Sequence, residues 1–157
     1  MSEFTHFDEY GNARMVDVSE KDITERMATA RGSISVSREV LDAILNKKVK
    51  KGDALTVAQT AGIMATKRTA ELIPMCHPLS LTNVELTFDV DEEACIITAF
   101  CTVATEGKTG VEMEALTGVS AALLTIYDMC KSIDRRMIMN DVHLVVKTGG
   151  KSGDFRF

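Results

Sequence analysis

The feature that most constrains the fold is an uncharged segment at residues 115–127. Apolar residues recur in and after it at offsets of three and four, which predicts a helix with one apolar stripe. The stripe contains Leu116, Val119, Leu123, Ile126, Cys130 and Ile133. The opposite side leads to Asp128 through residues that are small or apolar, namely Thr117, Ala121 and Leu124. A helix that is apolar nearly all round packs on more than one side, so we expect the chain to be organised around it.

Two charged residues, Asp128 and Lys131, follow this segment three residues apart. Charged groups at the end of a packed helix lie where a cleft or a subunit interface would meet it, and this is compatible with a catalytic interpretation. The same spacing also fits an ordinary ion pair on a helix surface. The pattern alone leaves both interpretations open.

The composition is typical of a single globular domain. The chain has 157 residues, 45% of them hydrophobic and 26% charged, which is enough for a substantial core. We find no apolar run long enough to span a bilayer and no secretory leader pattern, so we expect no membrane partner and a cytoplasmic location. The net charge of −5 argues against a nucleic-acid partner held mainly through its phosphates.

The cysteines give no sign of a metal site. None of the four forms a C-x-x-C pair, the pattern of zinc ribbons and redox dithiols. We therefore predict no metal and interpret the cysteines as buried free thiols. They are Cys76, Cys95, Cys101 and Cys130.

Secondary structure is predicted in a simple order. We expect a flexible tail at residues 1–14 and one domain at residues 15–157. The domain begins with a long strand or hairpin arm from Met15 that is kinked at Gly32. Ser37 is a plausible N-cap of a short helix, which ends in the basic run at residues 47–51. Lysines there suit the negative end of that helix.

Helices and strands are also predicted in the second half of the domain. Residues 53–73 contain a seam of small residues typical of a tightly packed helix. Residues 83–90 and 94–105 predict an antiparallel hairpin, the long helix follows, and residues 140–148 predict a last strand. Without the short helix the order is βαββαβ. This predicts an α+β domain with a ferredoxin-like antiparallel sheet and helices on one face.

Two short motifs look like phosphate loops but do not meet the full pattern. Residues 107–109 read GKT and residues 150–152 read GKS, yet neither has the required glycine five positions earlier. What stays possible is an anion site at the helix that Gly110 opens. Glu112 and Glu114 already occupy that positive end, and they are equally explained as compensating the helix dipole.

Other candidates are a histidine and scattered basic residues. His77, fixed between Cys76 and Pro78, can serve in proton transfer or have a structural role. The basic residues are either solvated surface or, if they converge, a pocket for a polyanion such as a triphosphate. They are Arg26, Lys51, Lys67, Arg68, Lys131 and Lys147.

Long phrases of the chain resemble a known family. These phrases are MVDVSEKDITERMATARG, KGDALTVAQTAGIMATKRTAELIPMCHPLSLTNVEL, EGKTGVEMEALTGVSAALLTIYDMCKSID and DVHLVVKTGGKSG. Together they resemble the cyclic pyranopterin monophosphate synthase family, accessory protein C of molybdenum cofactor biosynthesis. The resemblance covers residues 13–153.

The resemblance implies an enzyme and an assembly. It implies a lyase that rearranges (8S)-3′,8-cyclo-7,8-dihydroguanosine 5′-triphosphate to cyclic pyranopterin monophosphate with release of diphosphate. No cofactor is implied. The assembly implied is a homohexamer, a trimer of dimers, with each active site at a dimer interface.

The resemblance also implies roles for individual residues. Asp128 corresponds to the catalytic acid or base and Lys131 to its essential partner. If burial brings their pKa values towards neutrality, this pair can exchange protons. The residues that correspond to substrate-binding positions are Lys51, Met75, Cys76, His77, Met113, Glu114, Lys67, Glu112, Arg26 and Lys147.

Two other functions are compatible with parts of the pattern. A non-catalytic ferredoxin-like module that binds and senses a nucleotide would use the same basic cleft. An RNA-binding sheet of this topology is disfavoured because the central strand offers Phe100 without an aromatic cluster. Turnover of the cyclised nucleotide would distinguish the enzyme from both.

Overall fold

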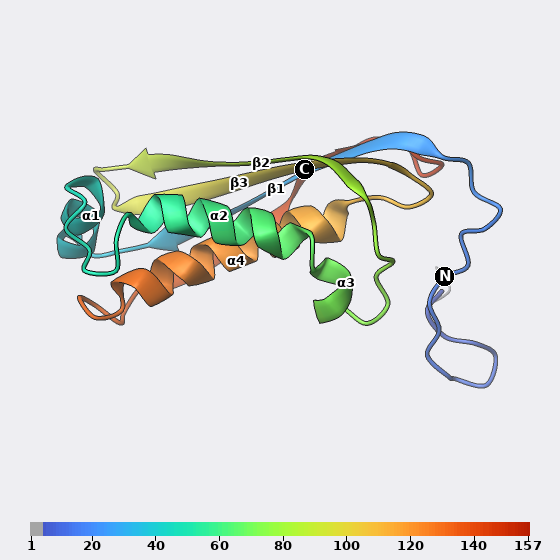
Figure 1. The fold of residues 1–157 in the computed structure, drawn as a ribbon, viewed down its shortest axis with the longest axis horizontal. Helices are drawn as coiled ribbons and strands as arrows, with labels where there is room; N and C mark the ends of the chain where they lie inside the picture. Colours follow the sequence, from blue (N-terminus) through green and yellow to red (C-terminus); the bar gives the residue numbers. More distant parts are fainter. Residues whose placement is uncertain (1–4) are drawn as a thin grey trace.

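The computed structural model describes residues 5–157 and has one antiparallel sheet (Figure 1). The sheet order is β2-β3-β1-β4-β5, and every neighbouring pair is antiparallel. The elements in chain order are β1 (Thr24–Ser35), α1 (Arg38–Leu45), α2 (Ala54–Thr66), α3 (Thr69–Leu72), β2 (Leu81–Asp91), β3 (Ile96–Gly107), α4 (Glu112–Cys130), β4 (Ile138–Thr148) and β5 (Phe155–Arg156).

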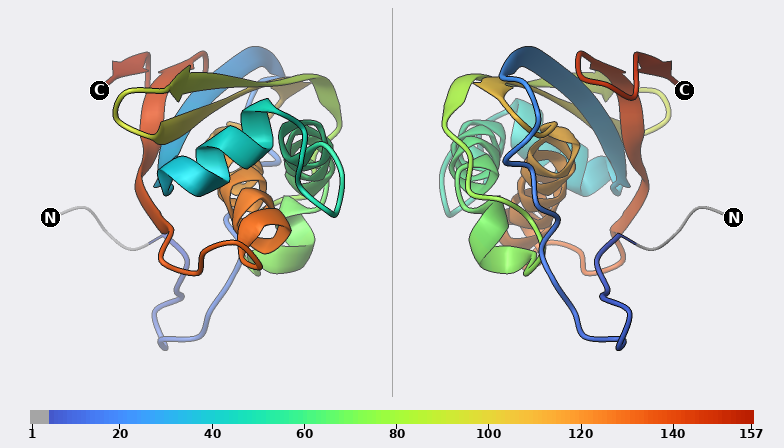
Figure 2. Two further views of the ribbon diagram at one scale, coloured as in Figure 1. Left: turned by 90° about the vertical axis from the view of Figure 1, so that its left-hand side faces the viewer. Right: turned by 90° about the vertical axis from the view of Figure 1, so that its right-hand side faces the viewer.

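The helices cover one face of this sheet. Figure 2 shows α1, α2 and α4 on the same side, and within residues 5–157 no helix lies over the opposite face of the strands. Strands β1 to β4 and helices α2 and α4 follow the βαββαβ order, with β1 paired to both β3 and β4. The prediction of an α+β, ferredoxin-like fold is confirmed. None of the helices within residues 5–157 combines the length and the apolar character needed to cross a bilayer.

Helix α4 is the central packing element that the sequence predicts. It packs on β1, β3 and β4 with its apolar stripe and on α2 with a neighbouring side. Four residues of the predicted stripe are fully buried or nearly so. They are Val119, Leu123, Ile126 and Cys130. Since Cys130 faces the core, its burial raises the pKa of its thiol to about 11.

Glycines allow α2 and α4 to approach each other closely. A β-carbon placed on Gly62 would lie 2.8 Å from the carbonyl oxygen of Gly118. A β-carbon on Gly118 would lie 2.6 Å from Sγ of Cys101 and 2.8 Å from Cγ2 of Thr66. Only a residue without a side chain fits such a contact. These glycines therefore set the distance between α2 and α4.

We expect Gly118→Ala to destabilise the fold. Overpacking costs roughly 1–3 kcal/mol, which exceeds the gain of about 1 kcal/mol from replacing a helical glycine with alanine. Chemical denaturation measures the free energy of unfolding. Thr60→Ala, at an exposed position of the partner helix α2, is the matched control. A Gly118→Ala protein as stable as the control would show that the two helices are not in close contact.

The first strand begins later than predicted. β1 starts at Thr24 and not at Met15, so the prediction of one long strand is wrong over residues 15–23. The reason lies in Asp17, whose side chain accepts hydrogen bonds from the backbone N–H and the hydroxyl of Ser19, at 2.9 and 2.6 Å. Such a local turn competes with strand pairing. At Gly32 the pairing of β1 with β4 shifts register, as a kink there predicts.

The second predicted helix is interrupted. Residues 53–73 form α2 and the short α3, with a break at Lys67 and Arg68. The hydroxyl of Thr66 donates to the carbonyl of Ile63 at 2.7 Å, and that of Thr69 donates to the carbonyl of Thr66 at 3.0 Å. These bonds offer the backbone an alternative to a continuous helix.

The caps of α1 and α2 follow from sequence. Ser37 accepts the backbone N–H of Val40 at 3.2 Å, which confirms the predicted N-cap, and Asp53 caps α2 by accepting from Thr56 at 3.2 Å. The basic run differs from its prediction. It does not cap α1, because Lys47 pairs with Asp53 at 3.2 Å and Lys51 reaches α4.

The segment before β1 carries a small turn. Phe7 and Ala13 form an isolated antiparallel bridge, and Asp8 accepts the backbone N–H groups of Tyr10 and Asn12 at 2.9 and 2.8 Å. Residues 1–4 of the predicted flexible tail lie outside the described residues. For residues 5–14 flexibility stays a prediction, and amide hydrogen exchange would measure it.

Candidate active site

The candidate residues lie at the two ends of α4. Asp128 and Lys131 lie at its carboxyl end, and Met113 and Glu114 lie in its first turn. With a rise of 1.5 Å per residue, about 22 Å of helix separates Met113 from Asp128. In Figure 1 the carboxyl end lies near α1, whereas the amino end lies near α3 and the N-terminal segment. One protomer therefore carries two separate clusters.

The carboxyl-end cluster is a carboxylate held between two ammonium groups. Nζ of Lys131 donates to Oδ1 of Asp128 at 2.7 Å, and Nζ of Lys51 donates to Oδ2 at 2.8 Å. Lys51 also donates to the backbone carbonyl of Asp128 at 3.0 Å, near the negative end of α4. The hydrogen bonds from Lys131 and then Lys51 lower the pKa of Asp128 to about 2.

This geometry corrects one sequence-based expectation. The side chains of Asp128 and Lys131 are 54% and 47% exposed, so the pair is not buried within the protomer. The expected shift of the Asp128 pKa towards neutrality is wrong for the protomer, because the two lysines stabilise its charged form. Asp128 is fully ionised at neutral pH.

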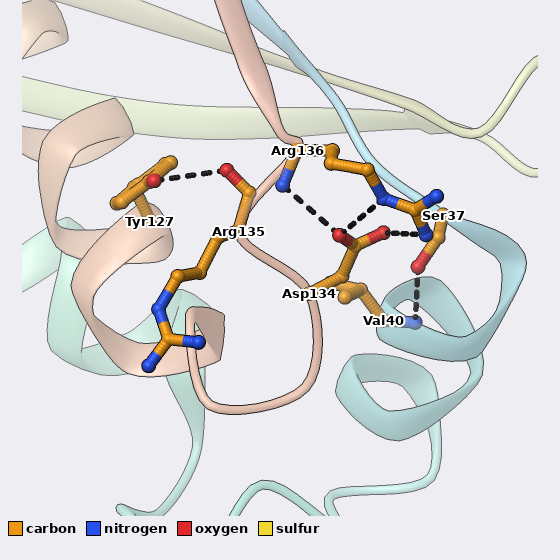
Figure 3. Close-up of polar contacts among 6 residues, drawn as sticks. All are labelled: Ser37, Val40, Tyr127, Asp134, Arg135 and Arg136. Atoms are coloured by element: carbon orange, nitrogen blue, oxygen red, sulfur yellow. Dashed lines mark hydrogen bonds and ion pairs between the residues drawn. The ribbon is translucent and has the colours of Figure 1, made fainter.

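Hydrogen bonds and an ion pair hold the loop that follows α4 against the carboxyl end of the helix. Figure 3 shows the hydroxyl of Tyr127 donating to the carbonyl of Arg135 at 2.9 Å. The guanidinium of Arg136 pairs with both oxygens of Asp134, at 2.9 and 3.0 Å. Beside them Ser37 caps α1. The loop therefore turns back over the end of α4 and holds the segment that carries Lys131.

The amino-end cluster surrounds a cavity of about 330 Å³. The loop between α3 and β2, the first turn of α4 and the N-terminal segment form its walls. The candidate residues that line it are Met75, Cys76, His77, Glu112, Met113 and Glu114. The structure thus gathers six sequence-predicted residues around one space large enough for a small ring system.

His77 is oriented by a backbone group. Its Nε2 lies 2.7 Å from the carbonyl oxygen of Val16. A carbonyl only accepts hydrogen bonds, so Nε2 is the donor, and in the neutral ring Nδ1 is the acceptor. The N-terminal segment therefore sets the tautomer of a residue that lines the cavity.

Among the groups that line the cavity, Glu114 has the largest shift in pKa. It is 4% exposed, and burial, with a smaller contribution from the nearby Glu112, raises its pKa to about 7. The burial of Cys76 itself, and then the charge of the nearby Glu114, raise the pKa of the Cys76 thiol. The carboxyl group tuned towards neutrality is therefore Glu114 rather than Asp128.

This tuning predicts how stability changes with pH. Because Glu114 holds its proton more tightly in the folded protein, the folded state loses stability as pH rises from about 4.5 to about 7. We expect Glu114→Gln to remove this loss. Thermal unfolding of both proteins from pH 4 to pH 8 checks it, with the difference in melting temperature growing in favour of the variant up to about pH 7. A difference that is constant across this range would contradict the assignment.

The basic candidates flank this cavity. Lys147 pairs with Oε1 of Glu112 at 3.3 Å and donates to the hydroxyl of Ser152 at 2.6 Å. Arg26 is 8% exposed and donates from Nε to the carbonyl of Gly107 at 2.9 Å. Lys67 lines a smaller space of about 120 Å³ together with His77 and Glu114. Of the ten predicted binding residues, only Lys51 lies at the other end of α4.

Some lining residues carry no individual signal in the sequence. Val16, Val18 and Lys21 contribute a wall of the cavity, although they precede the first strand. The one signal that points to them is the phrase MVDVSEKD, which belongs to the resemblance. Within residues 5–157, no three His, Cys, Asp or Glu side chains cluster in a way that could hold a metal ion.

Comparison with known proteins places nearly the whole chain in one family. Residues 15–150 match the MoaC family. The chain is 54% identical to the cyclic pyranopterin monophosphate synthase of Halalkalibacterium halodurans, over 99% of this chain and 95% of that protein. It is 54% identical to the protein of that name from Staphylococcus carnosus, with 99% and 98% covered. For that of Desulforapulum autotrophicum the identity is 56%, with 99% and 95% covered. The chain therefore belongs to the MoaC family.

Proposed function

We propose that the chain acts as a cyclic pyranopterin monophosphate synthase. Its substrate would be (8S)-3′,8-cyclo-7,8-dihydroguanosine 5′-triphosphate, and its products cyclic pyranopterin monophosphate and diphosphate. The observation that carries the proposal is the match to synthases of this name at more than half identity over 99% of the chain. The proposal includes no cofactor and places the enzyme in the cytoplasm.

The proposal requires two copies of the chain for each site. A catalytic group must come within about 3 Å of the atom it serves, and about 22 Å of helix separates Asp128 from Met113. Asp128 therefore cannot act on a substrate bound in the cavity of its own protomer. It can act on a substrate bound in the cavity of a second copy.

The outward face of α4 is suited to such a pairing. Met113, Thr117, Ser120, Leu124 and Asp128 follow one another at offsets of three and four, so they lie on one face. None of the five is buried, and Leu124 is 57% exposed. The face is symmetric about the peptide bond after Ser120, since Met113 and Asp128 are equally distant from it, as are Thr117 and Leu124.

Two such faces packed antiparallel about a two-fold axis would complete two sites. Each Asp128 would then lie opposite the Met113 of the other copy, and each Leu124 opposite the other Thr117. A two-fold interface is self-complementary in this way. We propose a homohexamer, a trimer of dimers. The divided site supports the dimer, and the resemblance supports the hexamer.

The proposed roles follow from charge. Asp128, ionised at neutral pH, would accept protons during the ring rearrangement, and Lys131 would return them. The hydrogen bonds from Lys131 and then Lys51 keep the carboxylate charged. In the step that forms the cyclic phosphate, a ribose-derived hydroxyl releases its proton to solvent and its oxygen attacks the α-phosphorus, the bond from that phosphorus to the bridging oxygen breaks, and diphosphate leaves with the electron pair of that bond. Fixed positive charge stabilises that leaving group.

Turnover tests the proposal. The purified protein is incubated with the cyclised dihydro-GTP, and diphosphate release and the pterin product are followed together. We expect both to appear in equal amounts. Tight binding without either product would support the nucleotide-sensing module instead. No binding would rule out this substrate.

A further inference from the structure

A short segment before β1 lies between the two loops that wall the cavity of about 330 Å³. We call this segment, residues 16–19, the strap. Val16 and Val18 of the strap line the cavity, together with residues of the α3–β2 loop and of the β3–α4 loop. In the right-hand view of Figure 2 the blue segment before β1 passes in front of the amino end of α4. The strap is therefore the wall that connects the two loops.

Each loop holds the strap through one side chain. Nε2 of His77, in the α3–β2 loop, donates to the carbonyl of Val16 at 2.7 Å. Nζ of Lys108, in the β3–α4 loop, donates to the carbonyl of Ser19 at 2.7 Å. A hydrogen bond from an ammonium group is stronger than one between neutral groups. The strap is thus held at both of its ends.

The two ends of the strap are closely linked. Only Asp17 and Val18 separate Val16 from Ser19, and this length of chain spans at most about 10 Å. The side chain of Asp17 accepts the backbone N–H and the hydroxyl of Ser19 at 2.9 and 2.6 Å. The backbone N–H of Lys21 donates to the carbonyl of Val18 at 3.0 Å. A displacement of Ser19 would therefore also displace the carbonyl that orients His77.

Other roles explain Lys108 less well. It belongs to the GKT motif, which does not meet the phosphate-loop pattern. A cation just before α4 lies at the positive end of the helix dipole, where anions are favoured. Within residues 5–157 the cavity is lined by the neighbouring Thr109 and Gly110 but not by Lys108. Its hydrogen bond to the strap is the contact that links it to the cavity.

We propose that Lys108 is a positioning residue, which holds the strap so that the carbonyl of Val16 orients His77. The inference rests on the proposed function, because His77 is one of the proposed substrate-binding residues. Without the ammonium group of Lys108 the strap is released at Ser19, and the His77 ring exchanges between its two neutral tautomers. Turnover then falls, since a misplacement of about 1 Å can cost about 100-fold in rate.

Nuclear magnetic resonance of the histidine rings tests this role in the full-length protein without substrate. The chain has three histidines, and the signals that disappear in His77→Ala are those of His77. In mildly alkaline buffer, where imidazole is neutral, we expect the wild type to show His77 with its proton on Nε2. Lys108→Ala should show both tautomers and a kcat/KM about tenfold lower.

Two further lysine variants serve as controls. Lys108→Arg can still donate to the carbonyl of Ser19, so it should restore the single tautomer and most of the turnover. Lys48→Ala removes an exposed lysine between α1 and α2 and should leave both measurements as in the wild type.

The outcomes separate this inference from the proposed function. His77 signals that are the same in Lys108→Ala and in the wild type would overturn the inference, even if turnover falls. The exposed Asp17→Ala should release the ring as well, and unchanged signals there would overturn the inference even if Lys108→Ala does not fold. A His77 tautomer that depends on Lys108 in a wild type without turnover would overturn the proposed function and support the role of Lys108 in orienting His77.

Discussion

Asp128→Asn is expected to lower turnover by roughly 10²- to 10⁴-fold, the usual contribution of a general acid or base, while the protein stays folded. Asparagine has nearly the same shape but cannot accept a proton. The side chain is 54% exposed, so little packing is lost. Lys51 can still donate to the backbone carbonyl of residue 128, and the end of α4 is kept. Steady-state turnover and circular dichroism measure the two effects.

Two neighbouring variants sharpen this prediction. Lys131→Ala should also lose activity and should bind substrate more weakly, because it removes a positive charge from the site. Cys130→Ala is the matched control. Because the thiol is buried in the core, this substitution should leave catalysis unchanged. If Asp128→Asn fails to fold or to assemble, Asp128 is structural. If Cys130→Ala is folded but inactive, that thiol has a role beyond the core.

Leu124→Glu is expected to abolish activity without altering a catalytic group. Leu124 lies near the centre of the outward face of α4 and is 57% exposed in the protomer. In the proposed dimer it would be covered by the second copy, and burying an unpaired charge there costs several kcal/mol. A loss of about 4 kcal/mol corresponds to a roughly thousandfold weaker dimer. Light scattering coupled to size exclusion would show a smaller species, and turnover would fall with it.

A second exposed leucine provides the control. Leu45, at the end of α1, is 41% exposed and lies outside the face. Leu45→Glu should keep both the assembly and the turnover. If Leu124→Glu forms the same assembly as the wild type, then α4 is not the interface that completes the site.

Much of the fold could be predicted because the elements are locally encoded. Side-chain periodicity identified α4 and the β2–β3 hairpin, and the cap at Ser37 fixed the start of α1. Hydrogen bonds of individual side chains escaped prediction. Asp17 turns the chain before β1, and the hydroxyls of Thr66 and Thr69 interrupt the second helix. The sequence does not reveal to which backbone carbonyl a threonine hydroxyl will donate its hydrogen bond.

The candidate site was predictable as a set of residues but not as a geometry. Asp128 and Lys131 stood out because they follow an uncharged helix, and their pairing is present at 2.7 Å. The partner Lys51 lies 77 positions away in the chain, so its effect on the pKa of Asp128 could not be foreseen from spacing. Glu114 lines a cavity whose walls come from three separate segments. The division of the site between the ends of α4 becomes visible only when the helix is placed in the fold.

The measurement that tests the central claim most directly mixes two variants that are each expected to be inactive. Asp128→Asn lacks the proposed proton acceptor of one cluster, and His77→Ala lacks a residue of the other. If each site combines both clusters from different copies, a mixed dimer has one intact site. Denaturing and refolding the two together at equal concentration should then restore about one quarter of wild-type turnover, as random pairing in two-fold dimers gives. Turnover no higher than that of either variant alone would contradict a site shared between two copies.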